Sequence, residues 1–227
     1  MENYLPVLET LPLFAGIVPS EIVPLCCAFG CYTRRFGAGE LLWLRGDRVS
    51  AAGIVLSGSV QAERNAPDGT QHIVARHGVG ALFGDVLMSS QMQRSPVDIL
   101  ACEETTVLFL PLAEIMRDLG GRNAAAQVRF RLNLLGVISD KYWALYRRIG
   151  YLSEPTLRGR ILNYLHTLRD EQGRDTVQLP PMRETMAAEL HANRSAMCRE
   201  LGRMQREGLI VLSRRECTLK TKVSVPH

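Results

Sequence analysis

The sequence lacks the features that would place it in a membrane, on a secretion route or among disulfide-rich proteins. No apolar run approaches the roughly 20 residues that a bilayer-spanning helix requires. The first residues, MENYLPVLETLPLF, are acidic and contain two prolines, unlike a secretion or organelle leader. We therefore expect a cytoplasmic chain without membrane contact, whose six cysteines are reduced thiols.

The sequence also lacks the motifs of common enzyme classes. Metal-dependent enzymes built on small β-barrels, such as the cupins, need clustered ligands, typically His-x-His with a carboxylate close behind. His72 and His77 are the nearby histidines, and they are not spaced in this way. No P-loop, paired-carboxylate motif or Ser/His/Asp order stands out. We therefore predict no catalytic residue and keep a cupin-like enzyme as the less favoured alternative.

Net charge is small, but it is distributed unevenly. The chain of 227 residues carries +4 overall. Residues 155–227 hold 13 Lys and Arg against 8 Asp and Glu, whereas residues 1–154 hold 14 against 15. A nearly neutral first part and a basic last part are typical of a sensing domain followed by a nucleic-acid-binding domain. The length allows one large domain or two modest ones, each with its own core.

Three patterns follow one another along the chain and predict an α+β fold. From about 33 to 110, short apolar runs alternate with turn signals, as in a β-roll or barrel. The stretch APDGT, residues 66–70, predicts a hairpin turn, and Ser20 is expected to cap a helix ahead of the roll. The resulting domain division is 1–110 for the sensor with its N-terminal helices, 111–152 for a long helix and 153–227 for the last domain.

Apolar residues of the long helix repeat at spacings of seven, three and four. This heptad-like pattern predicts pairing with the same helix of a second copy, and packing on its own domain is the alternative. Ser153 and Pro155 are expected to end the helix at a hinge. The repeating residues, called the dimer seam below, are Val128, Leu135, Ile138, Tyr142, Leu145, Ile149 and Leu152.

Two short amphipathic patterns, about 183–190 and 194–207, are separated by a three-residue turn and predict a helix-turn-helix. The N-terminal end of the second helix enters the major groove, where arginine and serine can bond base edges. The outward residues at this end, called the reading face below, are Arg194, Ser195, Cys198 and Arg199. Residues expected to contact phosphates are Arg203, Arg206, Arg214 and Arg215.

Together these parts resemble the cAMP-receptor/FNR (Crp/Fnr) family of bacterial transcription regulators. The resemblance covers about residues 10–220, from the glycine-punctuated series starting at GELLWLRGD to MAAELHANRSAMCRELGRMQREGLI. It implies a cyclic-nucleotide-binding-like β-roll, a dimerisation helix and a C-terminal winged helix-turn-helix. It also implies a homodimer that binds a pseudo-palindromic site in double-stranded DNA, with RNA polymerase as an additional candidate partner. The complete helix-turn-helix argues against a module that signals only through protein contacts.

The resemblance also implies an effector site, but with departures. In nucleotide-binding relatives a Gly-Glu pair takes the ribose and an Arg-Ser pair holds the cyclic phosphate. Here Asp85 is one methylene shorter than that glutamate, and Leu145-Tyr146 replace the polar Thr-Ser pair of the cAMP receptor. We expect a small anionic or nucleotide-like effector other than cAMP, and a site that binds nothing is the alternative. The candidate residues are Gly84, Asp85, Arg94, Ser95, Leu145 and Tyr146.

The resemblance also implies two alternative cofactors, because some family members sense gases or redox state through haem or an iron–sulfur cluster. The cluster-binding relatives carry Cys-x2-Cys-x5-Cys, whereas Cys26 and Cys27 are adjacent here, Cys31 follows, and Cys102 is distant. On a continuous helix Cys27 and Cys31 would share a face. Conceivable haem ligands are His72, His77, Met88, Met92 and Cys102, and we name His77 as the candidate. The thiol of Cys198 is either a redox-sensitive group or a passive small residue.

Ser195 sets an expectation for the sequence of the DNA site. The cAMP receptor has a glutamate at the place of Ser195, and its carboxylate accepts from cytosine. Serine cannot make that contact in the same way, so we expect a half-site that differs from the cAMP-receptor consensus. Cys198 lies where relatives often have Gly or Ser, and its role stays open.

Overall fold

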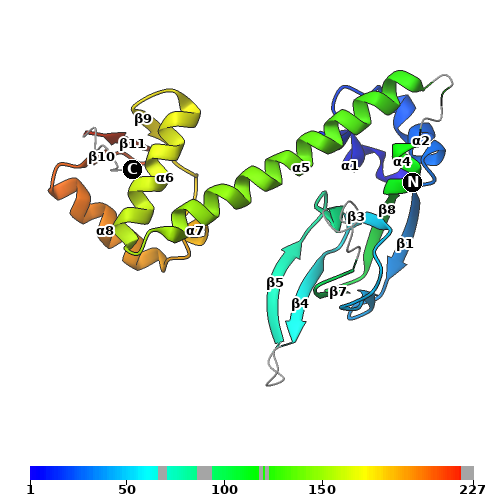
Figure 1. The fold of residues 1–227 in the computed structure, drawn as a ribbon, viewed down its shortest axis with the longest axis horizontal. Coiled ribbons are helices and arrows are strands. Elements are labelled where there is room, and N and C mark those ends of the chain that lie inside the picture. The colour runs from blue at the N-terminus through cyan, green and yellow to red at the C-terminus, as the bar shows by residue number, and fades with distance from the viewer. Residues whose placement is uncertain (66–70, 86–93, 118–119, 121–122, 221–227) are drawn as a thin grey trace. The chain divides into compact units, whose positions relative to one another are not determined.

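The computed structural model divides the chain into two compact units, Met1–Ser139 and Asp140–His227 (Figure 1). The boundary lies inside helix α5 (Ala124–Ser153). Among the described residues, no helix combines the length and apolar character needed to cross a bilayer. The structure describes residues 1–65, 71–85, 94–117, 120 and 123–220.

The first unit begins with short helices, and the capping prediction for them was wrong. Pro19 occupies the first helical position of α2, where its fixed φ suits the helix and its missing N–H costs nothing. The N-cap is therefore Val18, and Ser20 lies inside the helix without a capping bond. These elements are the 3-10 helices η1 (Glu2–Tyr4) and η2 (Pro12–Phe14) and the α-helices α1 (Leu5–Glu9) and α2 (Pro19–Ala28).

Two antiparallel four-stranded sheets form the roll, with strand orders β1-β8-β3-β6 and β2-β7-β4-β5. The predicted turn at 66–70 lies outside the described residues, but the flanking strands pair from Val60 opposite His77 to Asn65 opposite Gln71. The strands are β1 (Tyr32–Phe36), β2 (Leu41–Trp43), β3 (Ala51–Ser57), β4 (Val60–Asn65), β5 (Gln71–His77), β6 (Leu82–Phe83), β7 (Asp98–Ala101) and β8 (Thr105–Pro111).

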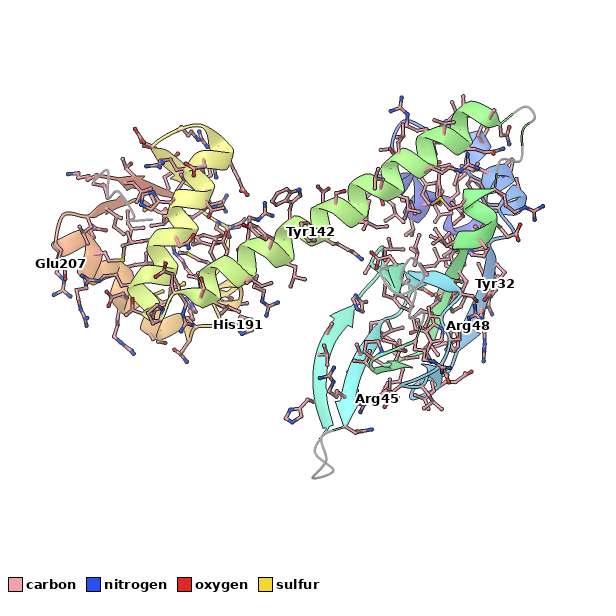
Figure 2. The ribbon with its side chains drawn as sticks, viewed as in Figure 1. Tyr32, Arg45, Arg48, Tyr142, His191 and Glu207 are labelled. Carbon is pink, nitrogen blue, oxygen red and sulfur yellow. The ribbon has the colours of Figure 1, made fainter. Side chains whose placement is uncertain are left out.

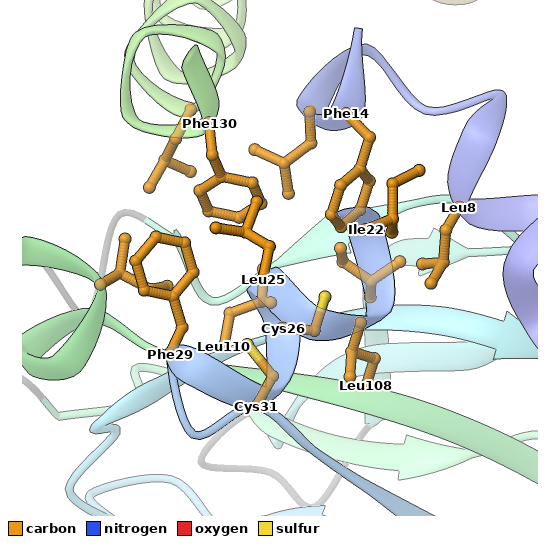
Figure 3. Packing of buried hydrophobic residues seen from close by; sticks show 14 of the residues in the cluster. Leu8, Phe14, Ile22, Leu25, Cys26, Phe29, Cys31, Leu108, Leu110 and Phe130 are labelled. Carbon is orange, nitrogen blue, oxygen red and sulfur yellow. The ribbon is translucent and has the colours of Figure 1, made fainter. Parts of the chain in front are cut away.

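The first sheet is buried on both faces because its central strands β3 and β8 are apolar almost throughout. Alternate residues such as Val55 and Phe109 point into the space between the two sheets. The other residues of these strands face the N-terminal helices and α5. There the Phe130 ring lies 5.4 Å from the Phe14 ring and 5.3 Å from the Phe29 ring (Figure 3). The first turns of α5 therefore belong to the core of the first unit.

The predicted long helix is divided into the short α4 (Leu112–Met116) and the 30-residue α5. Six members of the dimer seam are between 41% and 61% exposed. The exception is Ile138, which is partly buried because it packs against the core of the first unit. The six exposed members are Val128, Leu135, Tyr142, Leu145, Ile149 and Leu152.

The second unit packs three helices against a small sheet. The predicted break after Ser153 is confirmed, because α6 (Leu157–Gln172) starts anew with the Thr156 hydroxyl accepting from Gly159 N at 3.0 Å. The predicted end of this helix at Gly173 is also confirmed, with a φ of +63°. The remaining elements are β9 (Thr176–Gln178), α7 (Arg183–Glu189), α8 (Arg194–Arg206), β10 (Ile210–Leu212) and β11 (Glu216–Leu219), with sheet order β10-β11-β9.

Candidate nucleic-acid interface and effector site

Helices α7 and α8 form the predicted helix-turn-helix, with a four-residue turn because α7 ends at Glu189. Their apolar sides meet in the core of the second unit. Met186, Leu190 and Met197 have no exposed surface, and Leu201 is only 2% exposed. Burial of these side chains fixes α8 against the rest of the unit and leaves its polar side in solvent.

Two residues of the turn carry contacts that the sequence reading missed. The side-chain oxygen of Asn193 accepts from Ser195 N at 2.9 Å and from Ala196 N at 3.3 Å. Such an N-cap contributes about 1 kcal/mol to stability. An asparagine directly before the predicted helix could have indicated this cap from the sequence, because asparagine is a preferred N-cap residue. His191 has a φ of +46°, and its Nε2 accepts from Arg148 Nε at 2.8 Å. The turn is thereby connected to the last part of α5 (Figure 2).

All four residues of the reading face are exposed. Arg194 Nε lies 3.1 Å from a carboxylate oxygen of Glu184 in α7. Farther along α8, Arg203 Nη1 lies 3.2 Å from Glu200, and Arg206 Nε donates to the Gly202 carbonyl at 3.3 Å. The cationic groups are thus held by neighbours of the same unit, and their contact with DNA stays a prediction.

Arg158, at the start of α6, ties α8 at two places that were not predicted. Its Nε donates to Glu200 at 2.6 Å, and its Nη1 and Nη2 donate to the two oxygens of Glu207 at 2.7 and 2.9 Å. Paired N–H groups on one carboxylate form a strong, directional contact. These bonds lower the pKa of the Glu207 carboxyl, which lies just past the end of α8 (Figure 2).

The wing is the hairpin of β10 and β11, and its turn carries exposed Arg214 and Arg215. The turn is fixed through its backbone, because Ser213 N donates to Glu216 O and Leu179 N donates to Arg215 O, both at 2.8 Å. The two arginine side chains therefore extend from an ordered hairpin.

In the roll, the candidate effector residues are buried or contact other residues of the first unit. Gly84 has a φ of +72°, and a Cβ there would lie 2.6 Å from the Trp43 ring. Asp85 is only 4% exposed. Arg94 Nη1 donates to the Gly46 carbonyl at 2.8 Å, and the 2%-exposed Ser95 donates from Oγ to the Val97 carbonyl at 2.6 Å.

The other two candidate effector residues, Leu145 and Tyr146, belong to the second unit. Their side chains are 57% and 58% exposed. Residues 86–93, which separate Gly84 and Asp85 from Arg94 and Ser95 in the sequence, lie outside the described residues. The composition of an effector site therefore stays a prediction.

The predicted geometry of the cysteines was wrong. Helix α2 ends at Ala28, and Gly30 takes a φ of +66°, so Cys31 leaves the helix and returns to its buried side. Cys26 and Cys31 are both buried (Figure 3). Cys27 is exposed. The hydrogen bond with Cys26 and burial raise the pKa of the Cys31 thiol, which makes it a poor metal ligand or nucleophile.

Three of the candidate haem ligands, His72, His77 and Cys102, belong to the described part of the roll. The His77 ring stacks on Phe83 with centroids 5.7 Å apart, while His72 and Cys102 are exposed. Met88 and Met92 lie outside the described residues. Within the described part of the chain, no three His, Cys, Asp or Glu side chains gather as a metal site would require.

Comparison with known families decides the relationship. Residues 33–119 match the model of the cyclic nucleotide-binding domain, and residues 159–222 match that of the Crp-like helix-turn-helix domain. The chain belongs to the Crp/Fnr family. The resemblance seen in the sequence is confirmed, and so is the predicted fold of this Crp/Fnr protein. Its family is one of transcription regulators.

Two proteins of Thermus thermophilus are similar to this Crp/Fnr protein. The cyclic AMP receptor protein is 32% identical over 100 residues, which are 44% of either chain, so the match spans less than half of that relative. The crystal structure of the catabolite activator protein is 24% identical, with a TM-score of 0.51, and the match covers 92% of this chain and 93% of that one. The second likeness shows the fold.

Proposed function

We propose that this Crp/Fnr protein is a homodimeric, sequence-specific DNA-binding regulator of transcription that works in the cytoplasm. The reading face of α8 carries the proposal. Arg194, Ser195 and Arg199 are exposed together near the N-terminal end of the helix, whereas Met197 and Leu201 are buried. Arginine can make two hydrogen bonds to guanine O6 and N7, and serine can bond several base edges.

Other arginines supply affinity without sequence information. Arg203 and Arg206 lie later on α8, while Arg214 and Arg215 lie at the tip of the wing. Contacts from such positions to phosphates fix the orientation of a protein on the duplex. RNA polymerase is an additional candidate partner of the DNA-bound dimer.

The dimer is proposed from the seam of α5. Six apolar side chains at heptad-like spacings are exposed in the single chain. Exposed apolar surface arranged in this way is what a paired helix buries. Two copies would present two reading faces to half-sites about one turn of DNA apart.

Selection from a random pool of DNA duplexes tests this function. We expect enrichment of an inverted repeat with half-site centres about 10 base pairs apart. The half-site should differ from the cAMP-receptor consensus where Ser195 replaces the cytosine-bonding glutamate. A pool without any enriched sequence would contradict the function, whereas the unaltered consensus would contradict only the role of Ser195.

We also propose that a small anionic or nucleotide-like effector other than cAMP controls the protein through the roll. The candidate residues Gly84, Asp85, Arg94 and Ser95 lie at the end of β6 and at the start of the segment before β7. A guanidinium such as that of Arg94 favours an anion. The exposed Leu145 side chain offers no polar group to a nucleobase, which is why cAMP is disfavoured.

Absorption spectroscopy and mass spectrometry of protein purified without oxygen distinguish an organic effector from haem and from an iron–sulfur cluster. We expect a visible absorption spectrum without haem or iron–sulfur bands, and mass spectrometry of released material should find a small organic anion. Stoichiometric haem or cluster absorption would overturn the proposed effector class, while leaving the DNA-binding function to its own test.

A further inference from the structure

Glu184 and Arg194 face each other across the helix-turn-helix. Glu184 lies in the first turn of α7, and Arg194 is the first residue of α8. The carboxylate oxygen is 3.1 Å from Nε, and the two side chains are 56% and 62% exposed. An ion pair this exposed contributes little to stability. Its place beside the reading face suggests another consequence.

Because Glu184 contacts Nε of Arg194, the other N–H groups of the guanidinium remain able to donate hydrogen bonds. A guanidinium presents its N–H groups in a rigid fork, and Nε lies on the edge nearest the aliphatic stem. A carboxylate bound at Nε leaves the outer edge, formed by Nη1 and Nη2, able to make two parallel bonds. Guanine O6 and N7 accept this kind of pair in the major groove.

The charge of Glu184 affects the choice between a base and a phosphate. A phosphate on the same guanidinium would bring a second negative charge close to the carboxylate, which is unfavourable. Guanine O6 and N7 are neutral acceptors and carry no such penalty. An arginine beside a carboxylate is therefore biased toward the base edge, whereas an isolated arginine at a helix start is well suited to phosphate.

We infer that Glu184 is a specificity-determining residue, which positions Arg194 to read guanine and disfavours its use on phosphate. This inference rests on the proposed DNA-binding function. In this arrangement Glu184 acts through Arg194, whose Nε it contacts. Its removal should lower sequence discrimination and raise affinity for unrelated DNA, two effects of opposite sign.

Glu184→Gln tests the inference with three duplexes. These are the selected operator, the same operator with the base pair read by Arg194 exchanged, and a scrambled sequence. Arg194→Ala identifies that base pair as the position where discrimination is lost. We expect Glu184→Gln to reduce the preference for the original base pair about tenfold. Binding of the scrambled duplex should strengthen about twofold because a negative charge is removed.

Two further variants separate positioning from charge and structure. Glu216→Gln removes an exposed carboxylate from strand β11 of the wing and should strengthen scrambled binding without changing discrimination. In the Arg194→Ala background, Glu184→Gln should no longer alter discrimination, because the two residues act as a pair.

Distinct results would overturn the inference. Unchanged discrimination in Glu184→Gln, or an equal loss on all three duplexes, overturns it while the DNA-binding function stands. An equal loss on all duplexes in Arg194→Ala overturns it too, because that residue would then contact phosphate. A wild-type protein that does not discriminate among the duplexes contradicts the proposed function and the inference with it.

Discussion

The Ile149→Asp variant is expected to be a monomer that binds a complete DNA site at least about a hundredfold more weakly than the wild-type protein. Ile149 lies on the dimer seam and is 59% exposed in the single chain. In a symmetric pair of helices the change removes two isoleucines, each of which contributes about 1.5–3 kcal/mol when fully buried. It also places two carboxylates at the same apolar contact, where burial of unpaired charge is strongly unfavourable.

Loss of the dimer weakens DNA binding because the second half-site is no longer captured at high effective concentration. Sedimentation equilibrium measures the oligomeric state, and a gel-shift titration measures DNA affinity. Val79→Asp is the matched control, since Val79 is 57% exposed in the turn between β5 and β6 and lies off the seam. A dimeric Ile149→Asp protein, or equal dissociation of both variants, would refute pairing through α5.

Arg199→Ala is expected to relax base preference at one position of each half-site by about 1–3 kcal/mol, because one bidentate contact to a base is lost. Arg199 is exposed on α8, two positions before the buried Leu201. Affinity for unrelated DNA should fall much less. Competition titrations with operators altered at each base pair would measure this loss of preference.

Arg206→Ala supplies the comparison on the same helix. Arg206 lies in the last turn of α8, where its Nε donates to the Gly202 carbonyl. We expect a similar loss of affinity for every sequence and a salt dependence reduced by about one phosphate contact. If Arg199→Ala weakened all sequences equally, the assignment of Arg199 to a base would be wrong.

Local patterns were sufficient to predict much of the fold. Turn signals between apolar runs indicated most strands of the roll, but not the polar β1 or the two-residue β6. Gly173 marked the end of α6 because glycine adopts a left-handed φ without strain. The two amphipathic patterns identified α7 and α8 to within one residue at their ends. Ser20 was misjudged because a proline before it defines the first helical turn more strongly than a hydroxyl does.

Contacts between distant parts of the chain could not be read in this way. Arg158 is 42 residues from Glu200 and 49 from Glu207, and no local periodicity relates them. Cys26 and Cys31 came together only because the chain reverses at Gly30. The sequence indicates Glu184 only as an acidic residue in the first turn of a helix, because its contact with Arg194 depends on how α8 packs beside α7.

The bonds of Arg158 have a mechanical consequence. One planar guanidinium attaches α6 to a glutamate in the middle of α8 and to another just past its end, so both rotation and sliding of α8 against α6 would break charged hydrogen bonds. These bonds therefore restrain α8 from turning separately from α6. We expect any signal that changes its aim to turn α6, α7, α8 and the wing as one rigid body.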